Sequence, residues 1–398
     1  MAKHKVVIVG GGFGGIKAAL ELAQDSRFDI KVITDNPNFR YYPSLYHTAT
    51  GGSKETSSIP LKDIFGDFPG VSVIVASAKQ IDREKKLIKT ESNDEYEYDV
   101  LVLSLGMTTN FFGIPGLDEY AFGIKTNTEA ERLKQHLHKH VVKHKHPDLN
   151  YVVVGGGPTG VELAGVIGDY VKEICRQHGE SNRKIHVDLV EASPRLVAMM
   201  PKIVSKRIAS QLKKRGVKLY LNARVVGQTK DELMVGDKPI RSHTVIWTAG
   251  MSNNQFYTDN EFQLAKNRKV RVDQFLQAEP GIYVIGDNAD TAYSGVAQTA
   301  LLDGEFVASN IKRLADDEKP EPYVAKRPIY VLPAGPNWAA VVWGKVFIFG
   351  RVGWWLRRAA DFVAYRDYEP WFKATKRWLA ESKEEDLCPL CDPKDLAN

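Results

Sequence analysis

The same glycine pattern occurs twice in this sequence, each time directly after a run of apolar, mostly β-branched residues. The first copy, VVIVGGGFGGIKAAL, covers residues 6–20, and the second, YVVVGGGPTGVELAG, covers residues 151–165. The pattern G-x-G-x-x-G is formed by Gly10, Gly12 and Gly15 in the first copy and by Gly155, Gly157 and Gly160 in the second. Glycine at these places allows a tight turn, a close approach of the backbone to a phosphate, and close packing of helix on strand. Each copy therefore predicts a buried strand, a turn, and a helix whose N-terminus favours an anion.

A carboxylate follows the next expected strand in both copies. The strand 29–34 is followed by Asp35, and the strand 185–191 ends in Glu191. A carboxylate at this distance accepts hydrogen bonds from the ribose hydroxyls of a dinucleotide. Glu191 would also repel a 2′-phosphate, so we expect NADH to be preferred over NADPH, although Arg195, four residues on, leaves NADPH open.

Two further segments, YDVLVLSLG (98–106) and GIYVIGDNA (281–289), look like additional parallel strands of the first domain. We interpret the chain as α/β, with two Rossmann-like dinucleotide-binding domains of which the second is inserted in the first. One site would hold a tightly bound FAD and the other would admit NADH, so that hydride passes to the flavin. In flavoproteins with two such folds, a segment similar to GIYVIGD places its Asp beside the FAD ribityl and phosphate groups. Asp287 is that candidate, and the alternative is a turn residue that caps the next helix.

Composition narrows the classes further. The chain has 398 residues and a formal net charge of +5, which is too mildly basic to argue for nucleic acid. Three cysteines form no disulfide framework and favour a reducing compartment. The first strand starts at once, without room for a signal peptide, and the apolar stretch 341–356 is too short and interrupted to span a bilayer. We expect a protein of the cytoplasm or of the cytoplasmic side of the cell membrane.

At this point the motifs resemble those of a known family, the type II NADH dehydrogenases, which are single-subunit NADH:quinone oxidoreductases. The similar segments occur in the same order from about residue 4 to residue 313, and they are SLGMTTNFFGIPGLDEYAFGIKT (104–126), GGGPTGVELAG (155–165), LVEASPRL (189–196), VIWTAGM (245–251), GIYVIGDNA (281–289) and VAQTA (296–300). The resemblance implies an FAD domain (1–115 and 265–320), an NADH domain (116–264) and a C-terminal segment (321–398) that attaches the enzyme to the membrane. It implies electron transfer to a membrane quinone without proton pumping.

The resemblance also implies site residues. FAD contacts would be made by Gly10, Gly12, Gly15, Asp35, Ala78 through its backbone, Gly106, Asp287, Ala297 and Gln298. NADH contacts would be made by Gly157, Gly160, Glu162, Glu191 and Gly250. Glu162 matches a glutamate placed near the nicotinamide and sometimes given a proton-handling role, and with Gln298 it forms the candidate catalytic pair. The alternative for Glu162 is that its carboxylate only complements the helix dipole.

Two departures from the family pattern fall where the acceptor should bind. The family usually has a second glutamine after Gln298, and Leu302 stands in its place. The loop 39–51 keeps Pro43, Leu45, Tyr46 and Gly51 but is about one residue shorter. These changes leave the acceptor open between a quinone and a protein such as a rubredoxin or ferredoxin. A low-turnover NADH-sensing flavoprotein is a further alternative.

The C-terminal region has the composition of a membrane interface. Residues 338–378 hold six of the seven tryptophans, eight Lys or Arg, and three acids. Rings at headgroup level and cations facing anionic lipid would suit this composition, and the alternative is a core or dimer-contact helix. In the expected helix 370–381, Trp371 and Trp378 would share one face. We also expect a homodimer.

Two smaller features remain. His136, His140 and His144 repeat at helical spacing and could bind a metal, but a solvated helix face is the preferred interpretation, so no metal site is predicted. Cys388 and Cys391 form a C-x-x-C in the tail that could complete a zinc site in a dimer, act in redox chemistry, or have no such role.

Overall fold

The computed structural model describes residues 3–143, 150–180 and 182–381. The chain forms two compact units, and each is built from separate stretches of sequence. Unit 1 comprises residues 1–40, 59–108 and 251–328, and unit 2 comprises residues 41–58, 109–250 and those from 329 onward. The tail with Cys388 and Cys391 lies outside the described residues.

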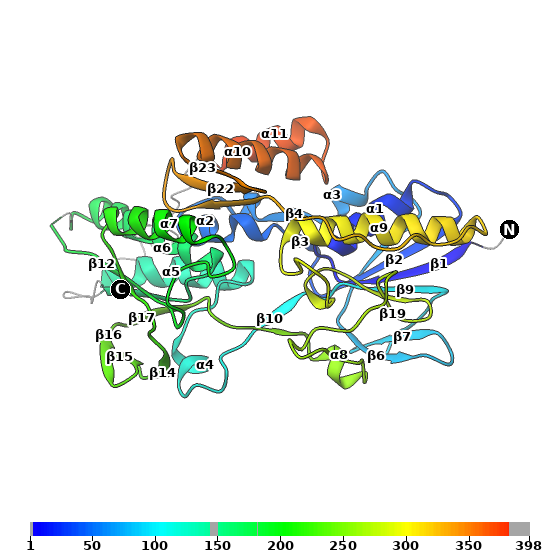
Figure 1. The fold of residues 1–398 in the computed structure, drawn as a ribbon, viewed down its shortest axis with the longest axis horizontal. Coiled ribbons are helices and arrows are strands. Elements are labelled where there is room, and N and C mark those ends of the chain that lie inside the picture. The colour runs from blue at the N-terminus through cyan, green and yellow to red at the C-terminus, as the bar shows by residue number, and fades with distance from the viewer. Residues whose placement is uncertain (1–2, 144–149, 181, 382–398) are drawn as a thin grey trace. The chain divides into compact units, whose positions relative to one another are not determined.

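Unit 1 is built on a six-stranded sheet with the order β19-β20-β9-β1-β2-β5 (Figure 1). All neighbouring strands are parallel except β19 and β20. The elements of this unit are β1 (His4–Val9), α1 (Phe13–Ala23), β2 (Phe28–Thr34), β3 (Asn38–Arg40), α3 (Leu61–Phe65), β5 (Val71–Val75), β6 (Ala78–Asp82), β7 (Leu87–Thr90), β8 (Glu95–Glu97), β9 (Val100–Leu103), β10 (Met107–Thr109), β18 (Met251–Asn253), α8 (Phe256–Asp259), β19 (Gln277–Glu279), β20 (Ile282–Val284), the 3-10 turn η3 (Gly286–Asn288) and α9 (Ala297–Ala315).

The central strand of unit 1 is buried on both faces, as its unbroken apolar run requires. Val7 and Val9 belong to a core cluster with Leu101 and Val284, whereas Ile8 points to the other face and is fully buried. On that face α1 packs along α9 (Figure 1). Gly304 of α9 allows this approach, since a Cβ there would lie 2.4 Å from the carbonyl oxygen of Gly14.

Unit 2 has a parallel sheet of four strands in the order β13-β12-β11-β17. Its elements are the turn η1 (Tyr42–Ser44), α2 (Leu45–Ala49), η2 (Lys54–Thr56), α4 (Leu117–Tyr120), α5 (Asn127–Lys143), β11 (Asn150–Val154), α6 (Pro158–Gln177), β12 (His186–Val190), α7 (Lys202–Lys214), β13 (Val217–Tyr220), β14 (Val225–Gln228), β15 (Glu232–Val235), β16 (Lys238–Arg241), β17 (Thr244–Trp247), β21 (Tyr330–Pro333), β22 (Ala339–Trp343), β23 (Val346–Gly350), α10 (Arg351–Arg366) and α11 (Trp371–Ala380). The short strand β4 (Ser58–Pro60) pairs with β3 where the chain returns to unit 1.

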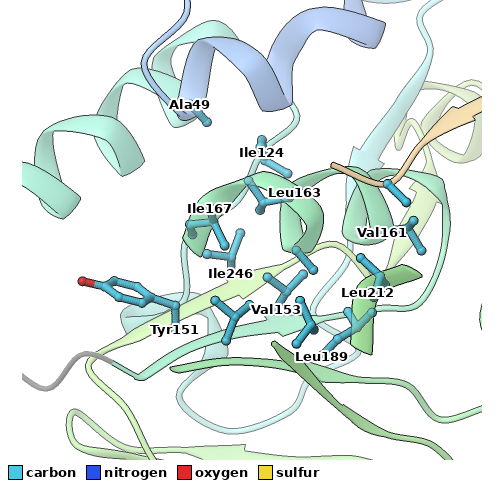
Figure 2. Packing of buried hydrophobic residues seen from close by; sticks show 14 of the residues in the cluster. Ala49, Ile124, Tyr151, Val153, Val161, Leu163, Ile167, Leu189, Leu212 and Ile246 are labelled. Atoms are coloured by element: carbon cyan, nitrogen blue, oxygen red, sulfur yellow. The ribbon is translucent and has the colours of Figure 1, made fainter. Parts of the chain in front are cut away.

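The core of unit 2 joins the sheet to α6 and α7. Figure 2 shows Val153 and Leu189 from the strands pointing toward Ile167 and Leu163 of α6, with Leu212 of α7 nearby. Each such side chain contributes about 1.5–3 kcal/mol when it is fully removed from water. The parallel strands and the helices between them confirm the predicted α/β class with two Rossmann-like folds.

The C-terminal segment packs in unit 2 instead of forming a separate compact body. Leu332, Ala340 and Val342 of its three-stranded sheet lie in the same core cluster as the strands of Figure 2. The expectation of a separate segment 321–398 therefore differs from the compact division. The reason is that these strands pack against α6, α7 and α10.

In the described ranges we find no helix that is both long and apolar enough to cross a membrane.

Candidate functional site

The glycine turn of unit 1 is open at Gly12 and closely packed at Gly10 and Gly15. Gly10 has φ of 115°, and a Cβ on Gly15 would lie 2.1 Å from the Gly10 carbonyl oxygen. A Cβ on Gly12 would meet no atom within 4 Å, and Gly12 caps α1 without a side-chain hydrogen bond. The space beside Gly12, at the start of α1, is therefore open, which fits a dinucleotide pyrophosphate at the helix N-terminus.

Unit 2 repeats this geometry. Gly155 also has φ of 115°, and a Cβ on Gly160 would lie 1.9 Å from the Gly155 carbonyl oxygen. A Cβ on Gly157 would again meet nothing within 4 Å, and Gly157 is the uncapped start of α6. Pro158 at the first helical position suits a helix start because it has no N–H to satisfy. Both turns are therefore open at the central glycine and closely packed at the third.

Strand register shows which residue follows each second strand at the turn. Val9 pairs with Ile33 and Val154 pairs with Val190, so Thr34 occupies in unit 1 the position of Glu191 in unit 2. The glycine turns agree, because a Cβ on Gly11 would meet Thr34, as one on Gly156 would meet Glu191.

Asp35 lies one residue beyond that position. Its side chain is 58% exposed and its Oδ2 is 3.1 Å from Arg40 Nη2. The contact of Asp35 with a ribose stays a prediction. Thr34, which stands where Glu191 stands in unit 2, was not among the predicted site residues. Counting strand residues from the glycines, instead of searching for the nearest acid, would have found it.

Glu191 is held against its own glycine turn. Its carboxylate accepts hydrogen bonds from the N–H of Gly156 (2.5 Å) and of Ser193 (2.6 Å). Each oxygen keeps a lone pair for a ribose hydroxyl. Arg195 is turned away from this role, since its guanidinium donates to the Met200 carbonyl at 2.6 Å and to the Ser205 hydroxyl at 2.8 Å. Arg195 was the reason for leaving NADPH binding open, and its guanidinium is instead hydrogen-bonded within the protein.

Replacing Glu191 by Gln is expected to narrow the preference for NADH over NADPH by roughly tenfold, because a difference of about 1.4 kcal/mol corresponds to one decade. The amide keeps an oxygen for one of the two backbone N–H groups but no longer repels a 2′-phosphate. The measurement is kcat/KM for both nucleotides. Equal use of NADPH by the unmodified protein would contradict the assignment of Glu191.

Gly250, the last of the predicted NADH contacts, follows β17 and lies close to the backbone of Asn110. A Cβ on Gly250 would lie 2.0 Å from the carbonyl oxygen of Asn110, and that oxygen also accepts a hydrogen bond from the Trp247 indole at 2.9 Å. The close approach explains the glycine by packing, and its contact with NADH stays a prediction.

The other predicted FAD residues lie on β6, on the turns after β9 and β20, and at the start of α9. Asn288, which was not among the predicted site residues, connects the turn after β20 to the turn after β9. Its side-chain amide accepts a hydrogen bond from the Gly106 N–H at 2.7 Å and donates one to the Gly106 carbonyl at 2.8 Å. Asn288 is fully buried beside the half-buried Asp287. Ala78 begins β6, and Ala297 and the exposed Gln298 begin α9.

A buried acid supports the turn of Asp287 from within. Asp303 on α9 accepts hydrogen bonds from the Gly286 N–H at 3.0 Å and from the Tyr323 hydroxyl at 2.5 Å. Burial raises the pKa of Asp303 to about 6. The carboxylate therefore fixes the backbone that presents Asp287.

Glu162 lies at the centre of a buried charged group in unit 2. It is 9% exposed on α6, and burial raises the pKa of its carboxyl to about 8. Its Oε1 is 4.0 Å from Arg357 Nη1, which is beyond hydrogen-bond distance. Burial therefore favours the protonated form of Glu162, and the charge of Arg357 opposes this shift. The helix-dipole role stays the alternative interpretation.

Arg357 connects Glu162 to the segment 41–58. Its Nε donates to Asp361 Oδ2 at 2.6 Å, and its Nη2 donates to the carbonyl of Pro43 at 3.1 Å. Asp361 also accepts from the Tyr41 hydroxyl at 2.8 Å, and burial raises its pKa to about 6. The sequence analysis counted Arg357 and Asp361 only as surface charges. Their spacing of four residues within a tryptophan-rich helix was the available signal.

The predicted histidine row is only partly described. The rings of His136 and His140 stack with centroids 5.4 Å apart, and His136 Nε2 lies 2.8 Å from the Thr244 hydroxyl. His144 lies outside the described residues. Over the ranges that the structure describes, no group of three or more His, Cys, Asp or Glu could hold a metal.

The sequence and the fold of this chain are similar to those of known proteins. A family described as pyridine nucleotide-disulphide oxidoreductase matches residues 4–304. The chain belongs to this family. Among curated members, the type II NADH:quinone oxidoreductase of Staphylococcus epidermidis (strain ATCC 35984) is 27% identical, over 90% of this chain and 94% of its own.

Solved structures share the pyridine nucleotide-disulphide oxidoreductase fold along nearly the whole chain. The NDH2 of Plasmodium falciparum in complex with NADH has a TM-score of 0.86 at 17% identity, covering 97% of this chain and 99% of that one. The sulfide:quinone oxidoreductase of Aquifex aeolicus has a TM-score of 0.77 at 19% identity, covering 96% and 92%. The resemblance to type II NADH dehydrogenases that the motifs indicated is confirmed.

Proposed function

We propose that this chain binds FAD in unit 1, oxidises NADH bound in unit 2, and passes two electrons to a quinone without pumping protons. The observation that carries the proposal is the pair of glycine turns, each open at the central glycine and each beginning an uncapped helix. The curated relatives named type II NADH:quinone oxidoreductases support the same activity.

FAD, when bound, supplies the hydride and electron chemistry, and the chain's own residues bind and orient. In unit 1, Gly12 leaves room for the pyrophosphate, while Asn288 and Asp303 hold Gly106 and the turn of Asp287 in place. In unit 2, Gly157 and Glu191 bind NADH, and Glu162 keeps a proton on its carboxyl. We assign Glu162 to proton delivery and Gln298 to a hydrogen bond with the quinone.

The proton on Glu162 gives a testable pH dependence. A carboxyl with a pKa of about 8 is protonated below that pH, so NADH-dependent quinone reduction is expected to fall as the pH rises through about 8. Glu162→Gln should be slower at neutral pH and should lack this fall, because an amide does not titrate. Steady-state rates across pH, at saturating NADH, measure both. A variant with the same profile as the unmodified protein would remove Glu162 from proton delivery.

The acceptor is tested by kinetics with NADH and a series of quinones. We expect fast turnover with a quinone. The KM for quinone should be higher than with a glutamine at position 302, because Leu302 cannot make one possible hydrogen bond to the quinone, a loss of about 0.5–1.5 kcal/mol. Rapid mixing separates flavin reduction from reoxidation. Reoxidation no faster with any quinone than with dissolved oxygen would favour a protein acceptor or an NADH sensor.

Cysteine chemistry is disfavoured as an alternative by the sequence. The stretches that make up unit 1 contain no cysteine, and Cys175 is buried in α6 of unit 2. A reductase that works through a cysteine pair beside its flavin would need both thiols there.

Peripheral attachment to a membrane is part of the proposal. Fewer cations of the segment 338–378 face outward than the sequence led us to expect. Three arginines of the segment 338–378 point inward, each with a buried carboxylate: Arg357 with Asp361, Arg358 with Glu381 and Arg377 with Glu369. Trp378 is partly buried and donates to the Arg358 carbonyl at 2.7 Å, whereas Trp371, seven residues earlier on the same helix, is exposed. The attachment we propose therefore rests on exposed rings more than on charge.

Trp355 and Trp371 are 68% and 66% exposed, which is unusual for tryptophan in a soluble fold. Replacing both by Ser is expected to weaken sedimentation with anionic vesicles by about tenfold or more, because a large apolar side chain contributes ~1.5–3 kcal/mol when it leaves water. Val226→Ser with Val324→Ser, also at exposed positions, is the matched control. Equal vesicle binding by the two double variants would contradict this attachment. The homodimer stays a prediction, checked by light scattering.

A further inference from the structure

A long stretch of unit 2 carries positive charge only. Residues 192–230 contain no Asp or Glu and ten Lys or Arg, which are Arg195, Lys202, Lys206, Arg207, Lys213, Lys214, Arg215, Lys218, Arg224 and Lys230. Half of these cations lie on α7. A helix with five basic residues and no acid has no internal ion pairs to neutralise it.

The cations of α7 point outward because the apolar residues of the helix point inward. Val204, Ile208 and Leu212 are buried in the core, whereas Lys206, Lys213 and Lys214 are exposed. Within the described part of the chain, none of the five basic residues of α7 forms a salt bridge, although Arg215, just after the helix, pairs with Asp169. A shallow groove of about 620 Å³ runs along this face, lined by Lys206, Ala209, Ser210, Lys213 and Lys214.

Exposed apolar side chains adjoin this face. Met199 is 68% exposed in the turn before α7, and Ile203 in its first turn is 43% exposed. Apolar side chains beside lysines form the composition of a surface that rests on lipid headgroups. A merely solvated basic helix would not need them.

The basic face also adjoins strands β22 and β23, of which β22 carries the exposed Trp343. Helix α7 lies beside β22 (Figure 1). The Arg207 guanidinium lies 5.8 Å from the centre of the Phe349 ring on β23. The hairpin of these strands exposes Trp343 (64%) and Val346 (55%). Three arginines of the C-terminal segment are paired inside the protein, and α7 adds cations to those that the segment still exposes, such as Lys345, Arg351 and Arg366.

We propose that the outward face of α7 is a second membrane-contacting surface, which binds the phosphate groups of anionic phospholipids. This inference rests on the proposed peripheral attachment and extends it to a helix of the nucleotide-binding fold. Charge complementarity selects the occupant: lysines beside a serine hydroxyl match phosphate oxygens, and the neighbouring Met199 and Ile203 match the acyl boundary.

The test compares two triple variants of the full-length, FAD-loaded protein. Lys206→Gln, Lys213→Gln and Lys214→Gln neutralise the groove, and Lys62→Gln, Lys86→Gln and Lys238→Gln remove the same charge at exposed positions on other elements. Binding to vesicles of phosphatidylcholine with phosphatidylglycerol is measured by sedimentation at low salt. Each lysine near an anionic surface contributes about fivefold, so the α7 variant should bind on the order of 100-fold more weakly, and the control variant should be nearly unchanged.

Several results would overturn the proposal. These are equal loss in both variants, no loss in the α7 variant, and equal binding of the unmodified protein to vesicles of phosphatidylcholine alone. Release by inorganic phosphate but not by sodium chloride of the same ionic strength would indicate a site for free phosphate and would also overturn it. Thermal unfolding of the α7 variant must match the unmodified protein, since Lys213 and Lys214 also complement the helix dipole. NADH oxidation with a water-soluble quinone, measured on the same samples, tests the proposed function separately from membrane binding.

Discussion

Gly157→Ala is expected to leave the protein folded and to raise the KM for NADH by about 10–150-fold. An added Cβ meets no protein atom within 4 Å, and Gly157 has φ of −74° and ψ of −176°, which alanine adopts freely. The methyl group would instead occupy the open space at the start of α6, where we propose that the pyrophosphate binds. Loss of one or more hydrogen bonds to a charged group costs about 1.5–3 kcal/mol. Steady-state kinetics at varied NADH give the result.

Gly160→Ala is the matched control for this experiment. Its Cβ would lie 1.9 Å from the Gly155 carbonyl oxygen, so this variant should lose thermal stability and not only NADH affinity. If Gly157→Ala kept the KM of the unmodified protein, the open position would not be the phosphate site. The proposed NADH site of unit 2 would then be wrong.

Arg357→Gln is expected to destabilise unit 2 by about 3–5 kcal/mol, because it leaves the buried Asp361 without its cation. The loss should grow with pH. Without Arg357 the folded pKa of Asp361 rises further above its unfolded value, and an acid of that kind destabilises the fold only once the pH exceeds the unfolded pKa, about 3.9. Urea unfolding followed by tryptophan fluorescence reports on unit 2 directly, since all seven tryptophans lie there.

The double variant Arg357→Gln, Asp361→Asn supplies the control. It removes both charges, and the new amides can still bond Tyr41 and the Pro43 carbonyl, so it should regain much of the lost stability. A double variant no more stable than Arg357→Gln alone would mean that the ion pair is not what holds α10. The loss would then have to come from packing of the arginine stem.

Local sequence predicted the parts of the site that depend on local backbone chemistry. Gly15 and Gly160 are required by the carbonyl oxygens of Gly10 and Gly155 five residues earlier, and Gly10 and Gly155 have a positive φ, so their pattern indicated the turns and the strands before them. Glu191 was found from its distance along the sequence after the second glycine turn. Strand register places Thr34 where Glu191 stands in unit 2, which the residue type did not indicate, and the ribose contact of Asp35 stays a prediction.

The buried charges could not be predicted in this way. Tyr41 and Asp361 are separated by 320 positions in the sequence and join only after the fold brings them together. A run of Arg and Trp has the same composition whether its cations face lipid or buried carboxylates, so Arg358 and Arg377 were counted as surface charges. Only the packing of α10 and α11 on residues 41–58 distinguishes the two cases.

The arrangement of unit 2 in the sequence has a consequence for biosynthesis. Residues 41–58 leave the ribosome early, yet the hydroxyl of Tyr365 that binds the Thr56 carbonyl and the carboxylate of Glu381 that binds Ser44 are made near the end of the chain. Co-translational folding can therefore complete neither unit until most of the polypeptide has emerged, although α2 can already pack on α5 and α6 once residues 127–177 are made. A premature stop codon before Tyr365 would leave Ser44 and the Thr56 carbonyl without these two partners.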